Sequence, residues 1–291
     1  MTIEELITRY INETKNRKRS DTLINEPSAF RPILKCLKAL NIEDANDLRY
    51  EDGERVIEWL KNNTRSKNTT INKRIGYIKT ALRHSKLMSN TFLLVPKLPN
   101  DTEPFVPMQH EVLKAAIKLS EIEVNKNSWV YNAIFILLYD TGCRINELLN
   151  IQKHNVLIDV NTIVLETQTT KGRQQRYVYF TSVNVDLIKK LIRSTPGTYI
   201  FWNYIKNRKM SRDDFKNYTR KMKEKLNVDR FHAHQIRKKF ATDMVVDGAN
   251  LKTVQTILGH KDYKTTENYV KYDAIIARKE YEKIMNKKKS R

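Results

Sequence analysis

Four prolines fall within a dozen residues about a third of the way along this chain. They are Pro96, Pro99, Pro104 and Pro107. Because proline fixes φ and has no N–H to donate, no regular helix or strand is expected to run through this segment. We therefore predict two domains, residues 1–95 and 108–291, joined by a proline-rich linker at 96–107. The 291 residues suffice for two separate hydrophobic cores.

The part before the prolines has the apolar spacing of amphipathic helices. Residues 3–11 follow the i, i+3, i+4, i+7 pattern, and similar patterns occur at 33–40, 56–60 and 71–82. A polar stretch precedes the last of these patterns and offers three N-cap candidates, Asn68, Thr69 and Thr70. A helical first domain is predicted.

The part after the prolines is also mainly helical, with one β-rich zone. Residues 129–138 are too apolar to face water and predict a central buried helix. Residues 162–167 and 176–180, on either side of a basic glycine-containing turn at 170–175, predict a β-hairpin. The predicted fold class is mainly α with a small sheet in the C-terminal domain. Further helical patterns begin at Val112, Val185, Phe215, His234, Leu251 and Ala274.

The charge of the chain indicates a polyanionic partner. There are 54 Lys and Arg against 33 Asp and Glu, a net charge of +21, and such an excess favours nucleic acid. The longest apolar run, Ala133–Tyr139, is far shorter than the roughly 20 residues of a membrane span. The start resembles no signal peptide, so we expect a cytoplasmic protein on DNA. Cys36 and Cys143 have neither disulfide-scaffold nor zinc-site spacing.

One short motif suggests an anion site. His234 and Arg237 are three residues apart, so on a helix their side chains would point toward one spot. A histidine and an arginine at this spacing are common in basic helices, and the motif alone decides nothing. Leu258-Gly-His260 and Tyr269 are equally weak when taken singly.

Taken in order, these motifs make the chain resemble the tyrosine recombinases of the phage integrase family. The resemblance covers about residues 130–272 and is carried by Arg144-x-x-Glu147, a lysine on the hairpin turn, His234-x-x-Arg237, Leu-Gly-His260 and Tyr269. It implies a site-specific DNA recombinase, of the integrase and excisionase type or of the type that resolves dimers. It also implies a C-shaped clamp formed by a helical core-binding domain and an α+β catalytic domain.

The resemblance assigns chemical roles that the physics of phosphoryl transfer supports. Attack on a phosphodiester builds a second negative charge on the phosphate oxygens, and fixed guanidinium groups can stabilise it without a metal. Tyr269 would attack and leave a 3′-phosphotyrosine, and neither metal nor cofactor is expected. Arg144 and Arg237 would hold the non-bridging oxygens, with His260 as a further donor, His234 as general base and Lys171 as general acid.

Several assignments have alternatives. Glu147 is interpreted as an orienting partner of Arg144, although it could be an ordinary surface glutamate. Lys171 competes with Arg173 and Arg176 on the same turn, and those two arginines are predicted to touch DNA. Tyr272 lies one helical turn beyond Tyr269 and could share its face. His232 is interpreted as structural or as a phosphate contact, not as a metal ligand.

The remaining predictions concern partners. In the first domain Lys67, Lys73, Arg74 and Lys79 are candidate contacts to double-stranded DNA, and a solvated basic face is the alternative. The last helix, at 273–286, would dock on a neighbouring subunit of a homotetramer on paired DNA sites, or pack within its own chain. Two other functions stay open: relaxation of DNA by a type IB topoisomerase, and DNA binding by a non-catalytic protein with the same fold.

Overall fold

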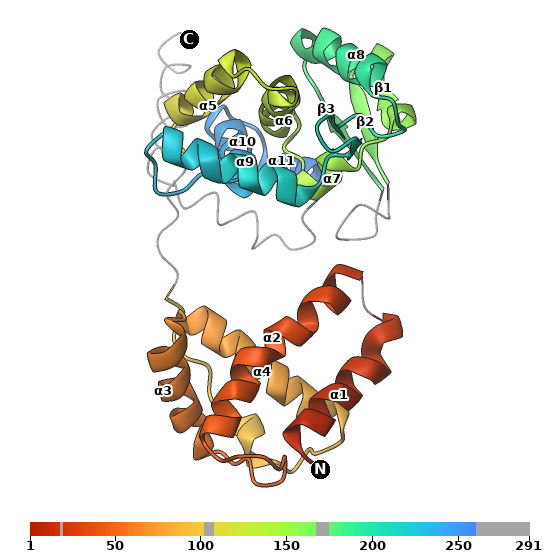
Figure 1. Cartoon of the computed structure of the whole chain (residues 1–291). Helices are drawn as coiled ribbons and strands as arrows, with labels where there is room; N and C mark the ends of the chain where they lie inside the picture. Colours follow the sequence, from red (N-terminus) through yellow and green to blue (C-terminus); the bar gives the residue numbers. More distant parts are fainter. Residues whose placement is uncertain (18–19, 102–107, 167–174, 260–291) are drawn as a thin grey trace, which may run out of the picture. The chain divides into compact units, whose positions relative to one another are not determined.

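The computed structural model describes residues 1–17, 20–101, 108–166 and 175–259, except the side chains of 20–25 (Figure 1). The chain divides into two compact units, Met1–Pro104 and Phe105–Arg291. The fold class predicted from the sequence, mainly helical with small sheets, is confirmed. None of the helices in the described ranges is both long and apolar enough to cross a membrane.

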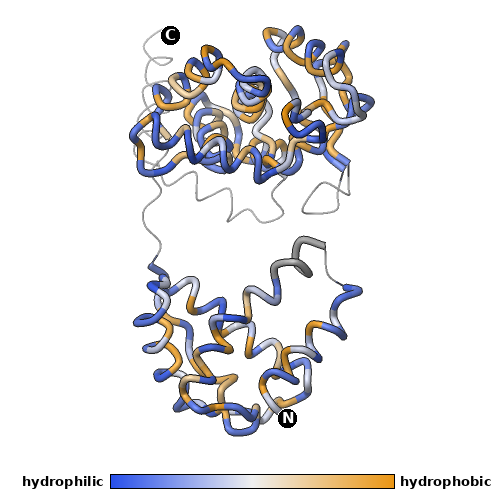
Figure 2. Tube along the Cα trace, in the orientation of Figure 1, coloured by the Kyte–Doolittle hydropathy of each residue, from blue (hydrophilic) through white to orange (hydrophobic). Residues whose placement is uncertain are grey.

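The first unit is built from helices around one apolar core. They are α1 (Ile3–Thr14), α2 (Ser20–Ala39), α3 (Asp52–Thr64) and α4 (Asn68–His84), with 3₁₀ turns η1 (Lys15–Arg17) and η2 (Thr91–Leu94). Leu6, Ile33, Leu60, Ile71 and Ile78 are fully buried, and hydrophilic and hydrophobic stretches alternate along the helices (Figure 2). The apolar patterns of the sequence therefore mark the inner faces of these helices.

The predicted cap of α4 is wrong. The helix already includes Asn68, Thr69 and Thr70, so none of them is its N-cap. Instead the carboxylate of Asp101 accepts hydrogen bonds from the backbone N–H groups of Asn68 (2.5 Å) and Thr69 (3.2 Å). A carboxylate at this end also complements the helix dipole.

Residues 96–101 of the predicted linker pack against the first unit. The side-chain amide of Asn72 exchanges two hydrogen bonds with the backbone of Leu98, at 3.0 and 2.9 Å. The amide of Asn68 donates to the carbonyl of Pro99. Together with the cap from Asp101, these bonds fasten this stretch along α4.

The second unit surrounds a buried central helix with helices and a small sheet. The central helix α6 (Ser128–Thr141) packs between α5 (His110–Ile122) and α10 (Ala233–Val246), and Ile134, Phe135 and Leu138 on it are fully buried. The prediction of a buried helix here is confirmed. The other helices are α7 (Ile145–Leu149), α8 (Val185–Ser194), α9 (Arg212–Lys225) and α11 (Leu251–Leu258), with 3₁₀ turns η3 (Lys153–Asn155), η4 (Ile158–Val160) and η5 (Ser182–Asn184).

The predicted hairpin is present. Strands β2 (Thr162–Leu165) and β3 (Arg176–Tyr179) pair antiparallel, with Ile163 opposite Val178, and β1 (Val156–Leu157) adds a third strand beside β2. The hairpin turn lies outside the described residues. The sequence did not predict β1 or the short ladder of β4 (Trp202–Asn203) and β5 (Arg208–Lys209).

A polar cluster fixes α10 on α6. The hydroxyl of Tyr139 donates to the carboxylate of Asp243 at 2.6 Å, and the buried ammonium of Lys239 pairs with the same carboxylate at 2.9 Å. Because a buried ammonium is stable only when paired, this cluster fixes the position of α10 along α6. That position matters because α10 carries His234 and Arg237.

Candidate active site

Arg144 and Glu147 form one unit where α7 begins. The carboxylate of Glu147 accepts hydrogen bonds from the backbone N–H of Arg144 at 2.9 Å and from its Nη1 at 2.8 Å. Glu147 is only 1% exposed. It is therefore not an ordinary surface glutamate, and its position fits the predicted orienting role.

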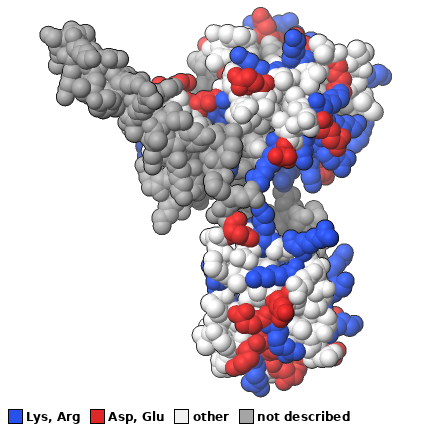
Figure 3. Space-filling model, turned by 90° about the vertical axis from the view of Figure 1, so that its left-hand side faces the viewer, with Lys and Arg blue, Asp and Glu red and all other residues white. Residues whose placement is uncertain are grey.

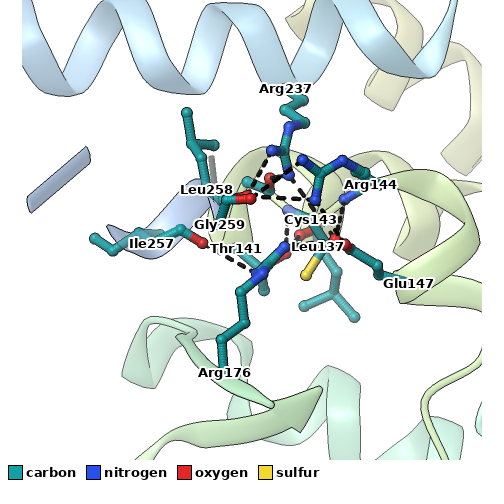
Figure 4. A network of polar contacts seen from close by, with 11 residues as sticks. Leu137, Thr141, Cys143, Arg144, Glu147, Arg176, Arg237, Ile257, Leu258 and Gly259 are labelled. Atoms are coloured by element: carbon teal, nitrogen blue, oxygen red, sulfur yellow. Dashed lines mark hydrogen bonds and ion pairs between the residues drawn. The ribbon is translucent and has the colours of Figure 1, made fainter. Parts of the chain in front are cut away.

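Arg237 reaches the same place from α10. Its Nη1 donates to the carbonyl of Gly142 and its Nη2 to the carbonyl of Leu258, both at 2.7 Å, and Nη1 lies 3.9 Å from Glu147. Arg144 makes longer contacts to the carbonyls of Leu258 (3.5 Å) and Gly259 (3.4 Å). Two arginines from different elements thus converge on the C-terminal end of α11 (Figure 4).

The two arginines differ in accessibility. The side chain of Arg144 is 29% exposed and that of Arg237 is 2% exposed. Cations are stabilised at a helix C-terminus by its unpaired carbonyls and dipole. The end of α11 therefore serves as a fixed acceptor that orients both guanidinium groups.

A third arginine, Arg176, completes the cluster. It is the first residue of β3, and its Nη2 donates to Glu147 at 2.5 Å while its Nη1 donates to the carbonyl of Ile257 at 3.0 Å. Its side chain is only 11% exposed. The prediction that Arg176 contacts DNA from a hairpin turn is therefore not supported, because its donors are directed inward.

The sequence did contain a signal for this placement. Along β3 and the residue after it, Arg176 alternates with Val178 and Phe180, both of which are buried, so the strand period directs the arginine to the same inner face. A guanidinium on an inward face requires an anionic partner nearby. Glu147 is that partner.

The charge balance of the cluster favours an additional anion. Burial raises the pKa of Glu147, but the charges of Arg176 and Arg144 and the hydrogen bonds from Arg144 outweigh it, so the pKa of this carboxyl is lowered. Glu147 is therefore ionised at neutral pH. One carboxylate faces the guanidinium groups of Arg144, Arg176 and Arg237, which leaves an excess of positive charge.

Gly142 allows α10, the helix that carries Arg237, to pack closely against the end of α6. It ends α6 with a φ of +63°, and a Cβ on it would lie 2.4 Å from the ring of Phe240. Replacing it with alanine is expected to lower the free energy of unfolding by about 2–4 kcal/mol, because left-handed backbone strain and the clash add. Urea unfolding measures this change.

The matched control is Gly76→Ala. Gly76 lies within α4 with nothing near its missing Cβ, so this substitution is expected to stabilise the first unit by about 0.5–1 kcal/mol. A loss below about 1 kcal/mol in Gly142→Ala, smaller than the expected strain alone, would contradict the role given to Gly142.

His234 lies one helical turn before Arg237 on α10. The residue is exposed overall, yet partial burial of its ring is the largest influence on its titration, and the charges of Lys238 and Arg237 act in the same direction. Together they lower the pKa of His234 to about 4. Its imidazole is therefore neutral at pH 7 and able to accept a proton.

We expect the His234 imidazole to titrate well below the ordinary histidine pKa of about 6.5. The neutral form should persist as the pH falls from 8 to below 6, because the surrounding positive charge opposes protonation. An NMR titration of imidazole carbons, with the His234 signal assigned through His234→Gln, measures this. The urea-unfolded protein is the reference, and a midpoint at or above that of the unfolded chain would contradict the expectation.

His232 is the N-cap residue of α10. Its backbone N–H donates to the side-chain carbonyl of Gln235 at 3.2 Å, and its ring stacks on that of His234 with centroids 6.5 Å apart. This fits the structural interpretation of His232. Within the described ranges, no group of three or more His, Cys, Asp or Glu side chains is arranged to hold a metal ion.

The other predicted catalytic residues lie outside the described residues. They are Lys171, His260 and Tyr269, and the same holds for Arg173, Tyr272 and the predicted docking helix at 273–286.

The four basic residues predicted to contact DNA in the first unit differ in their exposure and hydrogen bonding. Lys67 and Lys73 are exposed. Arg74 donates to the hydroxyls of Thr64 and Ser66 at 2.8 Å. The remaining one, Lys79, donates to a backbone carbonyl of its own unit, and burial is the first cause of its lowered pKa. Of the three that lie on α4, Lys73 is the most accessible, while Arg74 and Lys79 hold parts of their own unit together.

Comparisons with known proteins identify the family of this chain. The model of the phage integrase family matches residues 106–274. A probable integrase/recombinase of Acholeplasma phage L2 is 31% identical over 97% of this chain and 98% of its own length. Tyrosine recombinase XerC of Staphylococcus aureus (strain USA300 / TCH1516) is 27% identical over 78% of each chain.

Solved structures show the same fold. The Tn1549 transposon integrase in complex with a circular intermediate DNA has a TM-score of 0.78 at 18% identity and covers 98% of this chain and 99% of its own. A lambda integrase dimer bound to a core site has a TM-score of 0.74 at 14% identity, covering 92% and 77%.

The chain belongs to the phage integrase family. It is an enzyme of site-specific DNA recombination, which breaks and rejoins DNA strands.

Proposed function

We propose that this enzyme cleaves DNA through a 3′-phosphotyrosine on Tyr269, with Arg144 and Arg237 holding the scissile phosphate. The observation that carries the proposal is the convergence of these two arginines at the end of α11, with Glu147 bound to Arg144. Guanidinium groups keep their charge at any working pH and present forked donors to phosphate oxygens. Their fixed positions suit the charge that develops during attack.

The proposed step balances as a transesterification. The hydroxyl oxygen of Tyr269 forms a bond to phosphorus as the bond to the 5′ oxygen breaks, and its proton passes to His234. Lys171 gives a proton to the departing 5′ oxygen, and His260 donates a hydrogen bond to the phosphate. The neutral state of His234 supports its role as base. A 5′ hydroxyl from another strand reverses the step and rejoins the DNA, so no metal ion or cofactor is required.

Double-stranded DNA is the proposed partner of both units. The net charge of +21 and the groups of Lys and Arg on the face of each unit seen in Figure 3 support binding to phosphates. We propose that residues 1–95 form a core-binding domain, and that the two domains close on a duplex as a C-shaped clamp, with Lys67, Lys73 and Arg173 among the contacts.

We further propose a homotetramer on paired sites, joined through the segment 273–286. A lambda integrase tetramer bound to a Holliday junction shares the fold, with a TM-score of 0.72 at 14% identity, and supports this assembly. The phage relative is 31% identical over 97% of this chain, whereas the XerC relative of Bacillus pumilus is 25% identical over 95% of it. This favours integration and excision of a mobile element over resolution of replicon dimers.

A trapping experiment tests the proposed chemistry. The full chain is incubated, in the presence of a metal chelator, with nicked duplexes tiled across the DNA that flanks its gene. Loss of the short strand beyond the nick prevents rejoining, so a covalent protein–DNA adduct should accumulate on a denaturing gel. Absence of an adduct from every duplex that the protein binds, or an adduct that requires a divalent metal, would contradict the proposal.

Peptide mapping of the adduct identifies the nucleophile. Trypsin cuts after Lys264, Lys271 and Arg278, so Tyr269 and Tyr272 fall in different peptides, 265–271 and 272–278. Mass spectrometry should find the nucleotide on 265–271. A nucleotide on 272–278 would assign the attack to Tyr272 instead.

A further inference from the structure

Arg176 takes part in the cluster, yet the proposed chemistry gives it no role. Its two terminal nitrogens bond to two different elements, Nη2 to Glu147 at 2.5 Å and Nη1 to the carbonyl of Ile257 at 3.0 Å. Glu147 in turn holds Arg144. The fork of Arg176 therefore joins the start of α7 to the last turn of α11 (Figure 4).

Arg176 also lies against the C-cap residue of α11, Gly259. Gly259 has a φ of +64°, and a Cβ on it would be 2.5 Å from Nε and 2.7 Å from Cδ of Arg176. The two residues are therefore in close contact, and a side chain at position 259 would displace the arginine. The next residue in the chain is His260, to which we assign a phosphate contact.

The hairpin gives a third connection. Arg176 is the first residue of β3 and pairs with Leu165 of β2, so it begins the strand that follows the turn carrying Lys171. One side chain is thus linked to Arg144 through Glu147, to the start of the His260 segment through Gly259, and by the chain to the Lys171 turn.

We propose that Arg176 is a positioning residue, which locks the Arg144–Glu147 pair to the end of α11 and so sets the geometry of the phosphate site. This role rests on the proposed function. Arg176 acts through Glu147 and the α11 carbonyls and does not touch DNA.

Burial and bonding favour this role over the two simpler ones. A DNA contact would need exposed donors, but the side chain is 11% exposed and both Nη atoms bond inward. A purely stabilising arginine would have its donors satisfied, whereas Nε is buried with no acceptor among the described residues. An unsatisfied buried donor costs stability, so stability alone does not account for the arrangement.

The charge of Arg176 gives the role a distinct signature. The groups facing the Glu147 carboxylate are Arg144 from the start of α7, Arg176 from β3 and Arg237 from α10, together with the neutral thiol of Cys143. Without the charge of Arg176, burial would raise the pKa of Glu147 from its lowered value. Protonation of Glu147 on acidification would then release Arg144 at a higher pH than in the unaltered protein.

The test compares two substitutions with a matched control. Arg176→Gln removes the charge, Arg176→Lys keeps the charge but loses the fork, and Arg193→Gln removes one positive charge from an exposed position on α8. For each full-length protein, single-turnover adduct formation is measured on the nicked duplex across a range of pH. The Kd for the same DNA is measured separately.

We expect Arg176→Gln to form the adduct about 10- to 100-fold more slowly, as for small misplacements of reacting groups, with a Kd close to that of Arg193→Gln. Its rate should also begin to fall at a higher pH than that of the unaltered protein. Arg176→Lys should be slowed but keep the original pH profile.

Three results would overturn the proposal. The adduct of Arg176→Gln could form as fast as that of Arg193→Gln. Its affinity for DNA could fall by the same factor as its rate, or its rate could have the same pH profile as that of the unaltered protein. If Arg176→Gln does not fold, the test depends on Arg176→Lys. Adduct formation by Arg176→Lys at the rate of the unaltered protein would also overturn the positioning role. Failure of the unaltered protein to form any adduct would refute the proposed function itself, and the role of Arg176 with it.

Discussion

Replacing Arg144 with glutamine is expected to slow DNA cleavage about 1000-fold, within the range for removing one fixed donor or an arginine that faces a reacting phosphate. Arg144 is the more exposed of the two converging arginines, and its guanidinium is held by Glu147 and the end of α11. Glutamine retains hydrogen bonding but not the charge. Single-turnover adduct formation on the nicked duplex measures the effect.

The comparison variants separate catalysis from binding. The affinity for DNA is distributed over many phosphate contacts. The Kd of Arg144→Gln should therefore change little and match that of Arg193→Gln. Arg144→Lys restores the charge but not the fork and should recover only part of the rate. A cleavage rate for Arg144→Gln within about tenfold of the unaltered protein, far less than loss of such a donor costs, would contradict the role of Arg144.

The second large effect is on stability. Replacing Glu147 with glutamine is expected to lower the free energy of unfolding by about 3–5 kcal/mol, because it leaves buried cations without their anion. Arg144, Arg176 and Arg237 all face this carboxylate, which is 1% exposed. Urea unfolding at pH 7, followed by tryptophan fluorescence, measures the change.

The effect of Glu147 on stability should depend on pH in a defined direction. Since the folded protein lowers the pKa of this carboxyl, its contribution is complete above the ordinary glutamate pKa of about 4.3 and is lost as the pH falls through the lowered value. The difference between Glu147→Gln and the unaltered protein should therefore shrink in acid. Glu224→Gln, on the exposed side of α9, is the control and should stay within about 0.5 kcal/mol.

Local sequence patterns predicted much of the fold and part of the site. The central helix, the β2–β3 hairpin and the helix that carries His234 and Arg237 follow from periodicity over a few residues. Glu147 is three residues from Arg144, so their contact is also a local event.

Long-range contacts account for what the sequence did not predict. The cap of α4 comes from Asp101, 33 residues beyond Asn68, and polar residues at the helix start gave three plausible local caps instead. Arg176 meets Glu147 across 29 residues and Ile257 across 81. The strand period places Arg176 on the inner face of β3, but only the packing of the sheet beside α11 brings it to these partners.

The cap at Asp101 has a consequence for how the chain holds DNA. Because residues 96–101 are fastened to α4, only seven Cα steps lie between Asp101 and Met108, the next described residue, a reach of at most about 25 Å. In the proposed clamp, binding of one unit to a duplex would keep the other unit at an effective concentration on the order of millimolar. The two units of the proposed clamp would then bind DNA more tightly together than either alone, and dissociation would require both to release the duplex at nearly the same time.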